Sequence, residues 1–266
     1  MHSDGKNNLS NNTAEQIDLD FDRFQRDGYL IVRQILPAAT IGQLHQHIQE
    51  ALDPPLAPVE FEADVHYPGS PESRLAPGGA TPRRLLHVLS RHPDFRACAA
   101  APAVVSRLQK LMGSKQLLVS QNHHNCVMTK HPGFSSVTSW HQDIRYWSFD
   151  RPELVSTWLA LGEETRENGG LLVIPGSHRE HIDRGRMDAA LFLRTDLPEN
   201  QSLIEQAKVV ELQPGDMLFF HSTTFHAAGR NETGATKRSL VFTYRTIDNA
   251  PIPETRSAVY PDIVVS

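Results

Sequence analysis

The chain has 266 residues, of which 39% are hydrophobic, and this size favours one large globular domain over two independent units. Its formal charge is −5 and it contains no run of Lys or Arg, so we expect neither nucleic acid nor an anionic membrane as its main partner. No stretch approaches the ~20 apolar residues of a membrane span. The only two cysteines, Cys98 and Cys126, lack the spacing of a disulfide framework or a metal site, which predicts a reducing, cytoplasmic location.

The N-terminal segment, residues 1–15, is rich in Asn, Ser and Asp and has no apolar core of the kind a signal peptide needs. We expect it to be a disordered tail, followed by a single domain over residues 16–266. Within that domain, residues 21–36 are expected to pass from a short helix into a strand, with the break at residues 27–28. The next predicted helix has apolar residues at helical spacing and ends before two prolines. Its apolar positions are Ile41, Leu44, Ile48 and Leu52, and Thr40 is its expected N-cap.

The pattern changes twice along the rest of the chain. Residues 56–82 are rich in Pro and Gly, which predicts a long irregular loop of the kind that often covers a functional site. Residues 85–113 are predicted to be helical, with Gly113 ending an apolar stripe. Beyond residue 115, short apolar runs alternate with Gly- and Pro-containing turns, and this predicts a mainly β sandwich or barrel. The predicted strands are residues 117–120, 126–129, 154–160, 171–174, 209–212, 217–220 and 240–244.

A candidate metal site begins with His141 and Asp143, two residues apart. If this segment is extended, alternate side chains share a face, so both point the same way. His226 follows the strongly apolar strand at residues 217–220 and can supply a third ligand. Two histidines and one carboxylate on one face of an ion leave positions open, which suits iron(II), a co-substrate and dioxygen. The chain has 14 histidines, so this spacing becomes informative only with the motifs around it.

Further motifs follow one another in a fixed order around these three residues. They are DGYLIV at 27–32, KHPG at 130–133, WHQD at 140–143, ENGGL at 167–171, IPGSH at 174–178 and LQPGD at 212–216, followed by His226, Asn231 and Arg238. Together they resemble the phytanoyl-CoA dioxygenase family over roughly residues 21–245. The resemblance implies a mainly β fold whose core is a double-stranded β-helix, a cupin-like jelly-roll, with flanking α-helices. It also implies that iron(II) is held by His141, Asp143 and His226.

The resemblance further implies that 2-oxoglutarate is the co-substrate. Arg238 would meet its distal carboxylate, and Lys130, Trp158 and Cys126 would line the same pocket. A buried dianion needs a partner that is always charged, and arginine supplies a bidentate one. Lys237 is adjacent to Arg238, and strand alternation is expected to turn it to the opposite face. Either residue could serve in principle, and we favour Arg238.

The activity implied by the family is hydroxylation of a C–H bond of a small molecule by dioxygen and 2-oxoglutarate, with release of succinate and carbon dioxide. The carboxylate of Asp143 favours hydroxylation, because halogenating relatives have a small residue in its place. Two alternatives stay open: a non-catalytic cupin-like binding or sensing protein, and a zinc hydrolase with the same ligands. The sequence does not identify the primary substrate or the oligomeric state.

Other polar and aromatic residues near the predicted site have two interpretations each. His123 and His124 are adjacent, so they face opposite ways in a strand and cannot readily share one ion, although one of them can touch substrate. The remaining residues either line the substrate pocket or belong to the core or surface: Arg83, Arg84, Arg145, Tyr146 and Trp147.

Overall fold

The structure is a computed structural model and describes residues 14–266. The predicted disordered tail lies outside the described residues, except for Ala14 and Glu15, which begin helix α2. In the described part of the chain, no helix is both long and apolar enough to cross a membrane.

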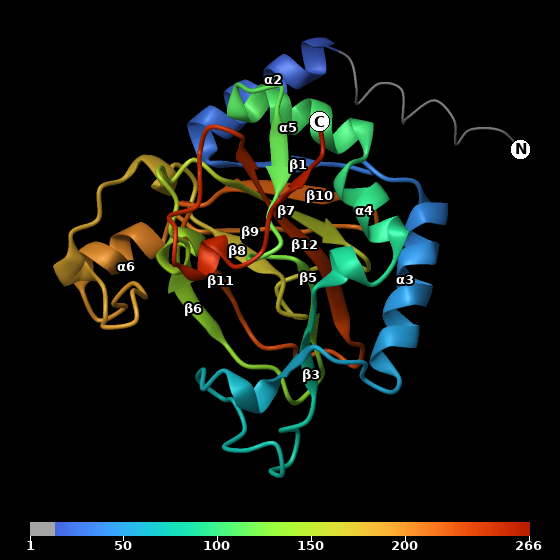
Figure 1. The fold of residues 1–266 in the computed structure, drawn as a ribbon. Coiled ribbons are helices and arrows are strands. Elements are labelled where there is room, and N and C mark those ends of the chain that lie inside the picture. Colours follow the sequence, from blue (N-terminus) through green and yellow to red (C-terminus); the bar gives the residue numbers. More distant parts are fainter. Residues whose placement is uncertain (1–13) are drawn as a thin grey trace, which may run out of the picture.

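Two antiparallel β-sheets form the centre of the molecule (Figure 1). The larger sheet has nine strands in the order β1-β10-β7-β12-β5-β3-β2, with β4 pairing with both β12 and β13. Its strands are Tyr29–Val32 (β1), Val59–Phe61 (β2), Pro82–Leu86 (β3), Leu117–Val119 (β4), Cys126–Lys130 (β5), Val155–Ala160 (β7), Met217–His221 (β10), Lys237–Thr246 (β12) and Ile263–Val264 (β13). The smaller sheet has four strands in the order β6-β11-β8-β9, namely Thr138–His141 (β6), His226–Ala228 (β11), Leu171–Val173 (β8) and Lys208–Val209 (β9). This two-sheet arrangement is the predicted jelly-roll core.

The two faces of the larger sheet are covered differently. One face packs against the helices, where Leu44 and Leu108 join sheet residues such as Phe242 in the main hydrophobic core. The opposite face lies toward the smaller sheet, where Trp158 and Val241 belong to a second apolar cluster. Burying a large apolar side chain stabilises the fold by roughly 1.5–3 kcal/mol, so both layers hold the sheet in place. The space between the two sheets is where a site can form.

The helices lie around this β-structure (Figure 1). They are Ala14–Asp27 (α2), Ala38–Leu52 (α3), Pro93–Ala99 (α4), Pro102–Met112 (α5) and Pro198–Ile204 (α6). Helix α5 ends as predicted at Gly113, whose φ of 63° is the left-handed conformation that glycine adopts readily. The expected cap of α3 is wrong: Pro37 occupies the N-cap position and Thr40 lies inside the helix.

Three other predicted elements differ from the structure. Residues 85–86, predicted to start a helix, instead end strand β3, where Leu85 is buried between its partners Val59 and Val127. A short apolar run of this kind fits either element by periodicity alone. The predicted loop at residues 56–82 contains strand β2 and a 3-10 turn at Glu62–Asp64. Of the predicted strand at residues 209–212, only Val209 lies in a strand, the two-residue strand β9.

Candidate metal centre and active site

Three side chains, two from one segment and one from a distant strand, meet between the sheets. His141 is the last residue of β6, and His226 is the first residue of β11 and its direct cross-strand partner. His141 Nε2 lies 3.9 Å from Asp143 Oδ1, and His226 Nε2 lies 3.6 Å from the same oxygen. The candidate ligand atoms of all three buried residues lie within 4.8 Å of one another. The structure therefore brings the predicted triad together.

The local backbone explains why His141 and Asp143 share a side. Strand pairing ends at His141, and Asp143 opens a 3-10 turn, Asp143–Tyr146 (η3). The two residues therefore do not lie on one continuous strand, which differs from the expectation. Gln142 between them is nevertheless extended, with φ −110° and ψ 138°. One extended residue is enough for the alternation that turns both side chains toward the same point.

Hydrogen bonds fix the protonation of the two histidine rings. His141 Nδ1 lies 2.9 Å from the carbonyl oxygen of Ser139, and His226 Nδ1 lies 3.0 Å from that of Thr224. A carbonyl only accepts, so each Nδ1 carries the proton and each Nε2 keeps a lone pair. Burial lowers the pKa of both histidines, which keeps the rings neutral. Two neutral nitrogens and one carboxylate fit a divalent transition metal.

His124 contacts the carboxylate of the third candidate ligand, Asp143. Its Nε2 lies 2.9 Å from Asp143 Oδ2. The other oxygen, Oδ1, is the one that His141 and His226 both approach. Burial alone would lower the pKa of His124, but the carboxylate outweighs it and raises the pKa to about 9. Burial alone would likewise raise the pKa of Asp143, and the charge of His124 is the leading cause of its being lowered instead. His123 and His124 lie in a bend before β5 rather than on a strand, so strand alternation does not apply to them, and both line the cavity beside the triad. His123 Nε2 lies 2.7 Å from Ser257 Oγ.

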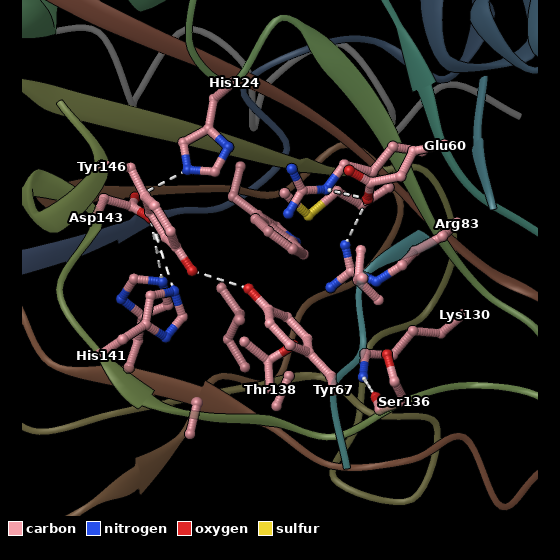
Figure 2. A pocket seen from close by; sticks show the side chains of 18 of the residues that line it. Glu60, Tyr67, Arg83, His124, Lys130, Ser136, Thr138, His141, Asp143 and Tyr146 are labelled. Carbon is pink, nitrogen blue, oxygen red and sulfur yellow. Dashed lines mark hydrogen bonds and ion pairs between the residues drawn. The ribbon is translucent and has the colours of Figure 1, made fainter. Parts of the chain in front are cut away.

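A cavity of about 370 Å³ opens beside the triad (Figure 2). This volume is within the ~300–1,000 Å³ typical of small-molecule sites. Tyr67 and Tyr146 point toward one another across it, and their hydroxyl groups are hydrogen-bonded at 2.8 Å. Tyr67 belongs to the segment predicted to cover a site, and Tyr146 belongs to the turn that begins at Asp143. The covering segment is thereby connected to the turn that begins with the candidate ligand Asp143.

The predicted co-substrate residues are not all found in the cavity. Trp158 and Lys130 line it, whereas Cys126 is buried in β5 and Arg238 is absent from the lining. Arg238 Nη2 instead donates to Gln49 Oε1 of helix α3 at 2.9 Å. Lys237 lines the cavity in its place, as the direct cross-strand partner of Lys130. The predicted alternation between Lys237 and Arg238 is correct, but the prediction of which one faces the cavity is wrong.

The phase of strand β12 explains this reversal. Leu240 and Phe242 pack under the helices, so Arg238, with the same parity, lies on that outer face. Val241 belongs to the cluster between the sheets, so Lys237 lies on the inner face. Because both faces of this strand are apolar, alternation in the sequence does not reveal which face is which.

Two arginines that also fit a surface interpretation lie at the cavity wall. Arg83 and Arg84 come from β3, and both approach Glu60, at 2.8 and 3.2 Å. Arg83 also lies 4.0 Å from Glu62. The 3.2 Å contact of Arg84 is an ion pair made by its Nε, which has no hydrogen bond to any residue among 14–266. Glu60 and Glu62 lie in a Pro- and Gly-rich stretch, so the sequence gives no sign that they belong to the site. The pairing of β2 with β3 brings them to the cavity wall.

Comparisons with known proteins agree with this geometry. The sequence model of the phytanoyl-CoA dioxygenase (PhyH) family matches residues 24–239. A probable phytanoyl-CoA dioxygenase of Caenorhabditis elegans is 24% identical over 85% of this chain and 74% of its own length. A methylphosphonate hydroxylase of Gimesia maris is 26% identical over 89% of this chain and 84% of its own.

A solved structure shares the fold. It is the epimerase SnoN in complex with Fe³⁺, alpha ketoglutarate and nogalamycin RO, with a TM-score of 0.73 and 20% identity over 96% of this chain and all of the other. This likeness confirms the predicted jelly-roll fold class. Since the family's sequence model covers most of the residues, the chain belongs to the phytanoyl-CoA dioxygenase (PhyH) family.

Proposed function

We propose that this protein is an iron(II)- and 2-oxoglutarate-dependent dioxygenase that hydroxylates a C–H bond of a small molecule and releases succinate and carbon dioxide. The observation that carries this proposal is the buried triad of His141, Asp143 and His226 beside the cavity. Three ligands on one side of an ion leave the positions on the cavity side for 2-oxoglutarate and dioxygen. Family membership and a structure of similar fold in complex with Fe³⁺ and alpha ketoglutarate support both cofactors.

The bound iron and 2-oxoglutarate would supply the oxidising chemistry, and the protein would supply orientation and a dry site. His124 and Ser156 hold the second carboxylate oxygen of Asp143, at 2.9 and 3.4 Å, so that its first oxygen is free for the metal. The distal carboxylate of 2-oxoglutarate needs a cation inside the cavity. Because Arg238 lies outside, we assign this role to Lys237, with Lys130 beside it.

The substrate is proposed to be small, or to insert only a small reacting part. The cavity of about 370 Å³ is near the lower end of the usual range and has to hold the co-substrate as well. The carboxylate of Asp143 supports hydroxylation over halogenation. A cytoplasmic location belongs to the same proposal, and both cysteines are free and buried.

The test is a screen of small metabolites for stimulated succinate release by protein loaded anaerobically with iron(II). We expect release to need iron(II), 2-oxoglutarate and oxygen, with catalase present to control for uncoupled turnover. Hydrolysis by the zinc-loaded protein without 2-oxoglutarate would support the zinc hydrolase instead. Binding of both cofactors without succinate formation for any compound would support the binding or sensing protein.

A further inference from the structure

A buried ion pair lies at the cavity where the co-substrate's distal carboxylate is expected. Lys237 Nζ is 3.1 Å from Glu164 Oε2, and each side chain is only 1% exposed. Lys237 lines the cavity, whereas Glu164 lies behind it, on the segment that follows β7. The proposed function uses Lys237 but leaves the buried carboxylate without a role.

Glu164 is held by more than the lysine. Trp158 Nε1 lies 3.0 Å from both of its carboxylate oxygens, and Ser239 Oγ donates to Oε1 at 2.6 Å. A carboxylate accepts hydrogen bonds through both of its oxygens, which suits these donors and the ammonium group of Lys237. Glu164 is therefore a fixed negative charge directly behind the lysine.

The same contacts position Lys237. Its Nζ is 3.0 Å from Ser239 Oγ and lies 4.9 Å from the centre of the Trp158 ring. Trp158, Ser239 and Lys237 thus all contact the Glu164 carboxylate on the inner face of the sheet. An ammonium group held this way is aimed by its partners, because a lysine stem is otherwise flexible.

Lys130, the neighbouring cation, does not make up for the positive charge of Lys237 that Glu164 offsets. Lys130 Nζ donates to the carbonyl oxygens of Ser136 and Gly229, and burial together with the nearby Lys237 lowers its pKa to about 7. A carboxylate bound by Lys237 therefore meets a pair whose charges largely cancel. Like charges separated by several ångströms in a protein change an affinity by about tenfold or more.

We propose that Glu164 is a positioning residue that aims Lys237 at the co-substrate and offsets its charge. The distal group is then bound by a neutral, hydrogen-bonding ion pair rather than by a full positive charge. This inference rests on the proposed use of 2-oxoglutarate. It predicts that the site discriminates only weakly between a charged tail and an uncharged tail of the same shape.

The test measures this charge selectivity by binding, without turnover. The whole protein, loaded with manganese(II), is titrated calorimetrically with N-oxalylglycine, whose tail is a carboxylate, and with N-oxalylglycinamide, whose tail is the isosteric amide. We expect the wild type to favour the carboxylate only a few-fold. Glu164→Gln keeps the size of the side chain and removes its charge, so it should tighten the carboxylate ligand about tenfold and leave the amide ligand unchanged.

Glu163→Gln is the matched control, because it makes the same chemical change one residue earlier at an exposed position. Its exposed carboxylate contacts only Gln213 among the bonds of the described chain, and we expect neither affinity to move. If Glu164→Gln folds normally and its selectivity equals that of the wild type, Glu164 is merely structural and the inference is overturned. If the wild type binds neither ligand, the proposed use of 2-oxoglutarate fails instead.

A double variant keeps the inference testable if Glu164→Gln does not fold. Lys237→Met with Glu164→Gln removes both charges and leaves no buried ion unpaired. We expect it to lose at least tenfold in affinity for both ligands, because neither tail then meets the ammonium group of Lys237, and to favour the carboxylate still only a few-fold. Unchanged binding of N-oxalylglycine would show that the pair does not face the co-substrate.

Discussion

Two clusters in the described chain contain two histidines and one aspartate, yet they differ in almost everything else. One is the buried triad, and the other, His47, His92 and Asp94, is half-exposed where α3 meets the start of α4. In the surface cluster the candidate metal-binding atoms are already used in hydrogen bonds. His47 Nε2 lies 2.9 Å from Asp94 Oδ2, and His92 Nδ1 accepts from the Asp94 backbone N–H. In the triad, backbone carbonyls fix the rings and leave the inner nitrogens free. Residue type alone therefore does not make a metal centre, because free lone pairs beside a cavity are also needed.

Removing the carboxylate from each cluster is expected to give the largest difference between the two. We expect Asp143→Ala to abolish substrate-dependent succinate release, a larger loss than the roughly 10–100-fold typical of an outer-shell partner. Asp94→Ala should leave turnover unchanged. Normal product formation by the Asp143 variant would disprove the site assignment.

Metal binding without turnover sharpens the same contrast. Manganese(II) at about 100 times its dissociation constant should stabilise the wild type by about 2.7 kcal/mol, because it binds the folded state. The matching rise in melting temperature should vanish in His226→Ala and persist in His92→Ala, as measured by calorimetry. A rise that depends on His92 would place the ion at the surface cluster.

His124 tests whether the support of the triad is as important as its ligands. His124→Phe keeps an aromatic ring but removes the contact with Asp143, so we expect an outer-shell loss of roughly 10–100-fold in metal affinity. His123→Phe is the control, since that ring contacts Ser257 instead. Equal effects of the two substitutions, measured by metal titration, would argue against a specific role for His124.

The two cations of β12 give a smaller effect. Lys237→Met should raise the 2-oxoglutarate requirement about tenfold, whereas Arg238→Met should change it less than about twofold, because only Lys237 lines the cavity. Steady-state titration of 2-oxoglutarate distinguishes the two. A larger effect at Arg238 would restore the role predicted for it from the sequence.

The smallest effect is expected at the surface cluster. His47→Ala removes one half-exposed hydrogen bond and should cost about 0.5–1.5 kcal/mol of unfolding free energy. The metal-free protein would then melt a few degrees lower, with turnover unchanged. Loss of turnover in this variant would contradict the structural role assigned to His47.

The sequence predicts the β-rich core and the triad because both depend on local patterns: short apolar runs between turns, and ligands embedded in ordered motifs. It does not predict the phase of β12, since Leu240 and Val241 are both buried on opposite faces and either assignment satisfies alternation. Glu164 is missed for another reason. It lies in a charged stretch typical of a surface turn, and only its pairing with Leu212 across the fold places it inside.

The hydrogen bond between Tyr67 and Tyr146 has a consequence for access to the iron. A single bond of this kind contributes about 0.5–1.5 kcal/mol, so at about 1 kcal/mol roughly one molecule in six has it broken at any moment. This bond is thus easily opened, whereas the neighbouring backbone stays attached through Val137 N–H, which donates to the carbonyl oxygen of Pro68 at 3.1 Å. A substrate that replaces the tyrosine pair would contact Tyr146, which lies on the same short turn as Asp143.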